Sequence, residues 1–230
     1  MPPANTDARH LAHLMCDATR DLLWARAPDT VRSNGLQVRV GSGAATYHRF
    51  DPSARVHRIT YGQRMVAAKQ QPAQAVGWLS AREIRGRGYF DGVMSTLNLL
   101  AHTCCHEFAH LLQYSAGERR YRSVHNRAFY QHLDNLHASG AAEAVRHHLR
   151  AGADTAGVHL PDTEFDAPSP TALRARWSVG DPVVFGEGPR RHRGQVERVN
   201  RKTCTVRTTH PTPGARYRVP MILLRTLETA

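Results

Sequence analysis

The sequence predicts an α+β protein, in which a helical domain with a small antiparallel sheet is followed by a small all-β unit. Stretches with apolar residues at helical spacing occupy most of the first 150 residues, and three short alternating runs interrupt them. Four or five short strands, broken by turn residues, fill the end of the chain. With 230 residues and 41% hydrophobic content, the chain is long enough to bury a sizeable core.

The first domain opens with a helical pattern over residues 7–27, for which Thr6 is the expected N-cap. Three alternating runs follow, separated by GSG and DPS, and predict the antiparallel sheet. These runs span residues 36–40, 45–50 and 56–61. The helices expected after the sheet span residues 63–71, 93–115 (ended by Gly117), 124–138 (opened by Ser123) and 141–150.

The composition changes after residue 150. Residues 151–170 are rich in Gly, Asp and Pro, which predicts a flexible linker between a domain at 1–150 and a second one at 171–230. In the second domain, DPVVF, QVERV, TCTVRT and RYRVP are separated by GEGP, NRK and HPTPG. So many short strands in so few residues predict a small barrel of the SH3-like type.

Positive charge is concentrated in the second domain. The whole chain has a formal net charge of +12, of which residues 171–230 contribute +8. This imbalance indicates a partner with many negative charges, and nucleic acid bound without reading of base sequence is the expectation, with DNA favoured. The alternatives to DNA are a protein partner, an RNA partner, or a basic surface that only aids solubility. The expected phosphate contacts are Arg190, Arg191, Arg193, Arg198, Arg201 and Lys202.

Several features indicate a cytoplasmic protein, associated with the nucleoid if it is bacterial. The four cysteines form no CxxC pair, which is typical of a reducing compartment. The N-terminus, MPPANTDARH, lacks the basic and apolar regions of a secretory signal. No run of eighteen apolar residues is present, so no membrane span is expected.

The segment HEFAH, residues 106–110, fits the pattern His-Glu-x-x-His. On a helix, His106 and His110 lie one turn apart on the same face, so both imidazoles can reach one zinc ion. Glu107 is rotated to one side and is the expected general base for the attacking water. Apolar residues at helical spacing, including Cys104 and Phe108, place the core on the opposite side. The alternative is a buried histidine pair satisfied by hydrogen bonds.

A catalytic zinc site requires a third protein ligand and one open position. The extension HExxHxxGxxH fails, because Gln113 and Ala116 stand where it needs Gly and His. Glu143 is an isolated candidate. His125 is the better one, because the expected helix over 124–138 places it in the first turn, with Phe129 one turn later facing the first helix. An ordinary core histidine is the alternative interpretation of His125.

The sequence supports weaker predictions for several other polar residues. His102 lies one turn before His106 and could support the ligands, whereas His132, His137, His147 and His148 are interpreted as surface residues. A further donor should stabilise the oxyanion, and the candidates are Tyr114, Tyr121, Tyr130 and several arginines.

HEFAH followed by HNRAF resembles the SprT/Spartan-like zinc metalloproteases, whose pattern is HExxH followed by HGxxF, and RITYGQRM is similar to the strand and turn before their active-site helix. The resemblance spans roughly residues 8–150. It implies a zincin-type fold, zinc ligands His106, His110 and His125, and Glu107 as catalytic base. Asn126 replaces the usual glycine, the cysteine zinc ribbon of some members is absent, and the tail is similar to a KOW or SH3-like barrel.

We therefore expect a zinc-dependent endopeptidase that acts on proteins bound or crosslinked to DNA and is recruited by its basic second domain. One alternative is a regulatory metalloprotease of the ImmA/IrrE-like group, which cleaves a transcription repressor and usually has an acidic third ligand. Another is a non-enzymatic nucleic-acid-binding protein with a structural metal site.

Overall fold

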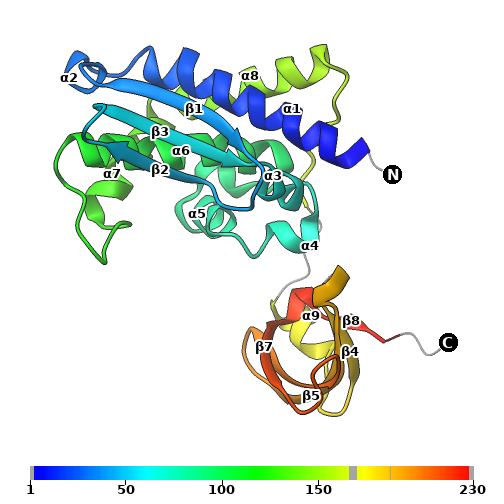
Figure 1. Ribbon diagram of the computed structural model, residues 1–230. Coiled ribbons are helices and arrows are strands. Elements are labelled where there is room, and N and C mark those ends of the chain that lie inside the picture. The colour runs from blue at the N-terminus through cyan, green and yellow to red at the C-terminus, as the bar shows by residue number, and fades with distance from the viewer. Residues whose placement is uncertain (1–2, 166–169, 187, 228–230) are drawn as a thin grey trace. The chain divides into compact units, whose positions relative to one another are not determined.

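A computed structural model of the chain describes residues 3–165, 170–186 and 188–227. The chain divides into two compact units, residues 1–165 and 166–230, which are treated separately below. The α+β class is confirmed: unit 1 combines helices with a three-stranded sheet, and unit 2 contains a five-stranded antiparallel sheet (Figure 1). No helix within the described ranges has both the length and the apolar character needed to cross a membrane.

The predicted helices and strands of unit 1 are present in the expected order with shifted ends. The elements of unit 1 are α1 (Pro3–Ala18), a π-helix (Thr19–Trp24), α2 (Asp29–Arg32), β1 (Gly35–Gly41), β2 (Tyr47–Asp51), β3 (Val56–Gly62), α3 (Gln63–Lys69), α4 (Pro72–Ala75), α5 (Leu79–Arg87), a 3₁₀ turn (Tyr89–Gly92), α6 (Thr96–Ser115), α7 (Arg127–Ala138) and α8 (Ala141–Thr155). The structure thus adds elements that the sequence did not predict, among them α2, α4 and α5. The first helix begins before residue 6, so the expected cap at Thr6 is wrong.

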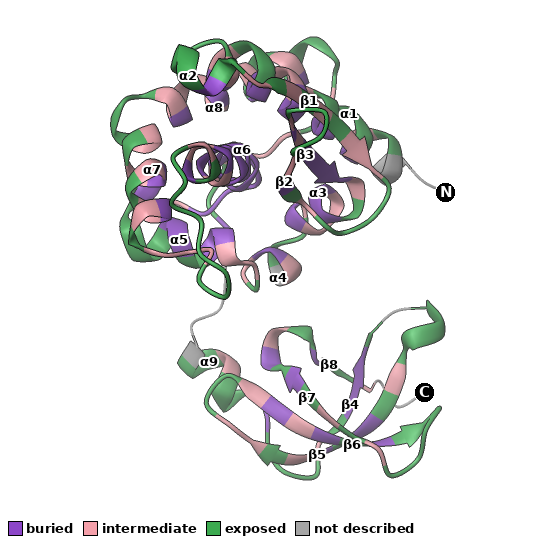
Figure 2. Ribbon diagram, turned by 60° about the vertical axis from the view of Figure 1, so that its left-hand side comes forward, coloured by how far each residue is buried: buried purple, intermediate pink, exposed green. Residues whose placement is uncertain are grey.

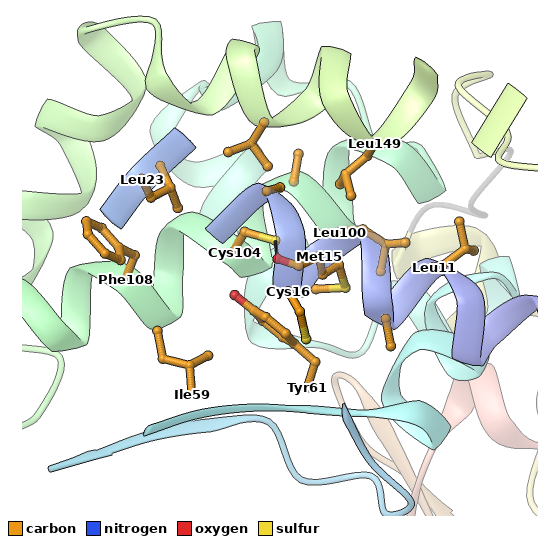
Figure 3. Packing of buried hydrophobic residues seen from close by; sticks show 14 of the residues in the cluster. Leu11, Met15, Cys16, Leu23, Ile59, Tyr61, Leu100, Cys104, Phe108 and Leu149 are labelled. Atoms are coloured by element: carbon orange, nitrogen blue, oxygen red, sulfur yellow. Dashed lines mark hydrogen bonds between the residues drawn. The ribbon is translucent and has the colours of Figure 1, made fainter. Parts of the chain in front are cut away.

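Helix α6 lies in the middle of unit 1, surrounded by the other helices and the sheet (Figure 2). The Ser95 side chain caps it by accepting a hydrogen bond from the Asn98 backbone N–H, and Gly117 follows its end in the left-handed conformation. The apolar face that contains Cys104 and Phe108 packs into the core, as the sequence predicts, and the structure shows that α1 and β3 lie against it there (Figure 3). A second apolar face of α6 packs against α7, so only a narrow strip of the helix remains open.

The sheet of unit 1 differs from the predicted antiparallel meander. The strand order is β1-β3-β2, with β3 parallel to β1 and antiparallel to β2, so the prediction is wrong for β1. The connection from β1 to β2 crosses the end of β3, where a Cβ on Gly62 would lie 2.5 Å from the Gly43 carbonyl oxygen. The absence of a side chain at Gly62 permits this crossing, and β3 pairs with both neighbours as a result.

The expected linker is shorter than the composition indicates. Helix α8 continues to Thr155, and the chain after it stays on unit 1, where Phe165 is 8% exposed. Backbone hydrogen bonds join Leu97 to Pro161 and Phe165 to Met94. Residues 151–165 are therefore part of unit 1 rather than linker, and residues 166–169 lie outside the described ranges.

Unit 2 consists of α9 (Pro170–Ala175), β4 (Pro182–Phe185), a 3₁₀ turn (Gly188–Arg190), β5 (His192–Val199), β6 (Thr203–His210), β7 (Arg216–Pro220), a 3₁₀ turn (Met221–Leu223) and β8 (Arg225–Thr226). The strand order is β7-β6-β5-β4-β8, and every neighbouring pair is antiparallel. Trp177 and Phe185 are core residues, as the sequence predicts. Closure of this sheet into an SH3-like barrel stays a prediction.

Candidate metal centre

Three histidines gather at one point beside α6. His106 and His110 come from consecutive turns of this helix, with ring centroids 4.9 Å apart. The Nε2 atom of His125 lies 3.2 Å from Nε2 of His106 and 3.1 Å from Nε2 of His110. The structure thus brings together the three residues that the sequence predicts as metal ligands.

These distances fit a metal site better than a set of hydrogen bonds. Ligand nitrogens about 2.0–2.1 Å from a tetrahedral zinc ion lie about 3.3–3.4 Å from one another. A neutral imidazole carries one N–H, so Nε2 of His125 can share a full hydrogen bond with only one of its two neighbours. Burial, reinforced by the charges of His106 and His125, lowers the pKa of His110 to about 3. The neutral form that metal ligation requires is therefore the favoured one.

His125 is not in a helix, which corrects one prediction. Helix α7 begins two residues later, because the Asn126 side chain caps it by accepting a hydrogen bond of 3.1 Å from the Phe129 backbone N–H. The Gln113 side chain of α6 donates to Asn126 Oδ1 and to the Val124 carbonyl oxygen, both at 3.0 Å. These bonds tie the residues on both sides of His125 to the helix that carries the other two ligands.

A carboxylate that the sequence analysis missed supports this centre. Oε2 of Glu83, on α5, lies 2.9 Å from Nδ1 of His106 and 2.9 Å from Nε2 of His102. Burial alone would raise the pKa of Glu83, but the hydrogen bonds from the two histidines outweigh it and hold this pKa well below its usual range. The ionised carboxylate accepts the Nδ1–H of His106 and leaves its Nε2 lone pair free for a metal.

The same hydrogen-bond chain continues away from the centre. His102 is fully buried, and its Nδ1 lies 3.1 Å from Nε2 of His137, whose ring stacks on Tyr89 with centroids 3.7 Å apart. His102 therefore supports His106 through Glu83, and His137 is not the surface residue that the sequence analysis expected. No sequence signal marked Glu83, because no element was predicted over residues 79–87, where the structure has α5.

Replacing Glu83 with glutamine should weaken metal binding about 10- to 100-fold, because the amide is a weaker acceptor for His106 and leaves its orientation less fixed. Competition with a chromophoric chelator measures the affinity. The control is Glu164→Gln, since Glu164 is exposed. Equal affinity in Glu83→Gln and the unsubstituted protein would show that Glu83 does not position the ligand.

Glu107 lies in the same cavity as the histidines. The cavity has a volume of about 300 Å³, and its lining includes all three imidazoles, Glu107 and Lys69. Glu107 is 6% exposed, and burial raises the pKa of its carboxyl, which makes the carboxylate a stronger base. A backbone hydrogen bond from His48 and the nearby charge of Lys69 act in the opposite direction and favour the ionised form.

Lys69 is a second residue that the sequence analysis missed. It ends α3, is 2% exposed, and donates a hydrogen bond to the Thr103 hydroxyl one turn before Glu107. Burial lowers the pKa of Lys69 to about 8, while Glu107 raises it. The ammonium group therefore remains mostly charged at neutral pH beside the candidate base.

The tyrosines expected to stabilise an oxyanion do not line this cavity. Tyr114 packs against Phe50, Tyr121 is 90% exposed, and Tyr130 stacks with the guanidinium of Arg87. Tyr47, Lys69 and Arg119 are among the residues that do line the cavity with an N–H or O–H. Of the predicted candidates, the structure thus places an arginine in the cavity but none of the three tyrosines, and it adds Tyr47 and Lys69.

The six basic residues predicted to contact phosphates lie in the segment 190–202 of unit 2, and all six are exposed. They occupy the turn before β5, β5 itself and the turn between β5 and β6. Two other arginines of this unit, Arg207 and Arg216, are bound by Glu197. The predicted residues thus share one stretch of surface-exposed chain, and their role in binding stays a prediction.

Comparison with known proteins found no matching family model, curated protein or solved structure. The function proposed below therefore depends on the geometry and chemistry of the centre.

Proposed function

We propose that this protein is a zinc-dependent endopeptidase that acts on DNA-associated or DNA-crosslinked proteins. The observation that carries the proposal is the convergence of three imidazole Nε2 atoms in the cavity that also holds Glu107. This combination of three imidazole ligands and a nearby carboxylate base is what hydrolysis at a zinc ion requires.

The donor set favours zinc. Three imidazoles without a carboxylate are typical of zinc, whereas Mg²⁺ and Ca²⁺ prefer oxygen ligands. When bound, zinc would polarise the scissile carbonyl and activate the attacking water. His106, His110 and His125 would hold it, and Glu83 would keep His106 in the required tautomer.

The remaining steps belong to side chains of this cavity. Glu107 accepts a proton from the attacking water and passes it to the leaving amine. The charge of the Lys69 ammonium acts against the burial that raises the pKa of Glu107 and so favours its ionised form, and the same charge favours the negative charge that develops on the substrate carbonyl oxygen. Arg119 at the same cavity adds a second positive charge.

The resemblance to the SprT/Spartan-like proteases supports the choice of substrate. Asn126, which replaces the usual glycine, has a defined role here as the cap of α7, so this departure does not conflict with a zincin-type fold. The convergence of His125 favours this group over ImmA/IrrE-like regulators, in which the third ligand is usually acidic. The basic unit 2 would deliver the protease to DNA.

A cleavage assay tests the proposal. The purified zinc-loaded protein is incubated with a DNA-binding protein as substrate, with and without single-stranded or duplex DNA. We expect cleavage that requires zinc and increases with DNA, because both proteins then occupy the same strand. Equal cleavage without DNA would overturn the DNA-linked function, and no cleavage under any condition would favour the non-enzymatic alternative.

A further inference from the structure

The loop between α6 and α7, residues 116–126, combines an exposed aromatic ring with several unpaired positive charges. We infer that this loop, here called the α6–α7 loop, binds single-stranded nucleic acid beside the metal centre. The binding itself is independent of the proposed protease activity. Its consequence, that a protein attached to the bound strand is presented for cleavage, rests on the proposed function.

The aromatic ring is Tyr121. It is 90% exposed, far more than any other tyrosine, phenylalanine or tryptophan among the described residues, and most of the loop around it is exposed as well (Figure 2). A single exposed ring is common on protein surfaces, so Tyr121 becomes informative through the charged groups around it.

The backbone holds Tyr121 at the tip of the loop. A turn is closed by the hydrogen bond from the Ser123 N–H to the Arg120 carbonyl oxygen, and Arg122 has a φ of 65°. This left-handed conformation costs a residue with a side chain free energy, and such strain is concentrated at functional sites. At the base, Asn126 Nδ2 donates to the Glu118 carbonyl oxygen at 3.1 Å. The loop is thus a constrained projection rather than a loose connection.

The charges on and beside the loop are almost all positive. Arg119, Arg120 and Arg122 belong to it and Arg127 follows it, whereas Glu118 is its one acidic residue and is already engaged by His132. Within the described parts of the chain, none of these four arginines forms an ion pair. Unpaired guanidinium groups in a cluster indicate a polyanionic partner.

A hollow of about 540 Å³ lies along the same segment. Its lining includes Arg120 and Arg127, the polar side chains of Ser123 and Gln131, and Glu118, whose carboxylate lies 2.8 Å from His132 Nε2. Guanidinium and hydroxyl donors around one depression suit the oxygens of a phosphate. The loop therefore offers a place for the backbone of a strand as well as a ring for its bases.

The combination of ring and charge favours a single strand over the alternatives. An unpaired base can stack on the free face of Tyr121, and the Arg122 guanidinium 5.4 Å from the ring adds a second planar group. Bases in a duplex are already stacked and cannot do this. An acidic protein surface would satisfy the arginines but would leave the exposed ring without a specific role.

Because the loop lies next to the metal centre, a strand bound to it would bring an attached protein close to that centre. Arg119 lines the metal-site cavity, and His125 is itself a residue of the loop. A strand bound to Tyr121 and Arg122 would therefore run past the mouth of the cavity that contains Glu107. This arrangement needs only residues of unit 1.

Photo-crosslinking of the full-length protein tests where a strand binds. An oligothymidine strand that contains 5-bromodeoxyuridine is irradiated with the protein, and the crosslinked peptides are identified by mass spectrometry. We expect a crosslink at Tyr121. Crosslinks confined to unit 2 would overturn the inference.

Binding affinities test the chemistry. Tyr121→Ala should weaken binding of labelled oligothymidine about 10-fold in fluorescence anisotropy, whereas Tyr121→Phe, which keeps the ring, should stay within about twofold. Arg122→Gln should reduce the salt slope by about 0.7. Arg85→Gln, at an exposed position on α5, is the matched control. An unchanged affinity in Tyr121→Ala, or an equal loss for duplex DNA, would contradict base stacking.

Two further arms identify the ligand. RNA and DNA share this chemistry, so the affinity for oligouridine is compared with the affinity for oligothymidine. The nucleic acid that binds more tightly is assigned as the natural class of ligand. Polyglutamate is added as competitor; if it displaces the strand at equal charge concentration, an acidic protein surface is the partner and the inference is wrong.

A nucleic-acid-free peptide separates this inference from the proposed function. Zinc-dependent hydrolysis of the peptide by Tyr121→Ala at the unsubstituted rate is expected if the loop only recruits the strand. If the unsubstituted protein hydrolyses the peptide but does not bind the strand, the loop inference is wrong and the proposed protease function stands. Strand binding at Tyr121 without any hydrolysis would sink the protease alone.

Discussion

Replacing Glu107 with glutamine should abolish peptide hydrolysis while the metal remains bound. Glutamine has nearly the same size but cannot accept the proton of the attacking water, and loss of a general base typically costs about 10²- to 10⁴-fold in rate. The three imidazoles are untouched, so the metal content measured by mass spectrometry should stay at one ion per chain. The rate of zinc-dependent cleavage, measured in the same preparation, provides the comparison.

The control for this change is Glu164→Gln, which removes an exposed carboxylate of unit 1 and should leave the rate within about twofold. Full activity in Glu107→Gln would exclude Glu107 as the base. Loss of activity together with loss of metal would point to a structural role for its buried carboxylate.

Replacing His125 with alanine should release the metal. Losing a residue that only orients a ligand lowers metal affinity about 10- to 100-fold, so losing one of three direct ligands should cost more than about 100-fold. After dialysis against a weak chelator, the variant should contain well below one ion per chain and show no cleavage. Unit 1 should keep its fold, because His125 lies in a loop before α7 and is not one of the buried core residues.

His10→Ala is the matched control, because His10 is an exposed histidine of α1 and should retain full metal content. Full metal content in His125→Ala would contradict the ligand assignment and favour a regulator with an acidic third ligand. Circular dichroism of both variants separates loss of metal from loss of fold.

The sequence was most informative where a signal depends on neighbours along the chain. The spacing of apolar residues predicted α6, and the four-residue separation of His106 and His110 predicted that their rings share a face. The end of α6 was also correct, because Gly117 adopts the left-handed conformation that few other residues tolerate. These features depend on local geometry and need no knowledge of the rest of the fold.

The start of α7 shows where local rules compete. Both Ser123 and Asn126 can cap a helix, and the prediction placed the cap at Ser123. The structure selects Asn126, because Gln113 on α6 donates to the same side-chain oxygen that caps α7. A contact between two helices thus decided a boundary that propensity left open.

By itself, the sequence determined the α+β class, the central helix and the pair of histidines with Glu107 between them, because helical periodicity relates residues three and four apart. Only the tertiary structure decided that Glu83 supports His106 and that Lys69 lies buried beside Glu107. It also decided that β3 lies between β1 and β2. Each of these depends on segments that are distant along the chain and meet only when the core forms, and no local pattern records which distant partners will meet.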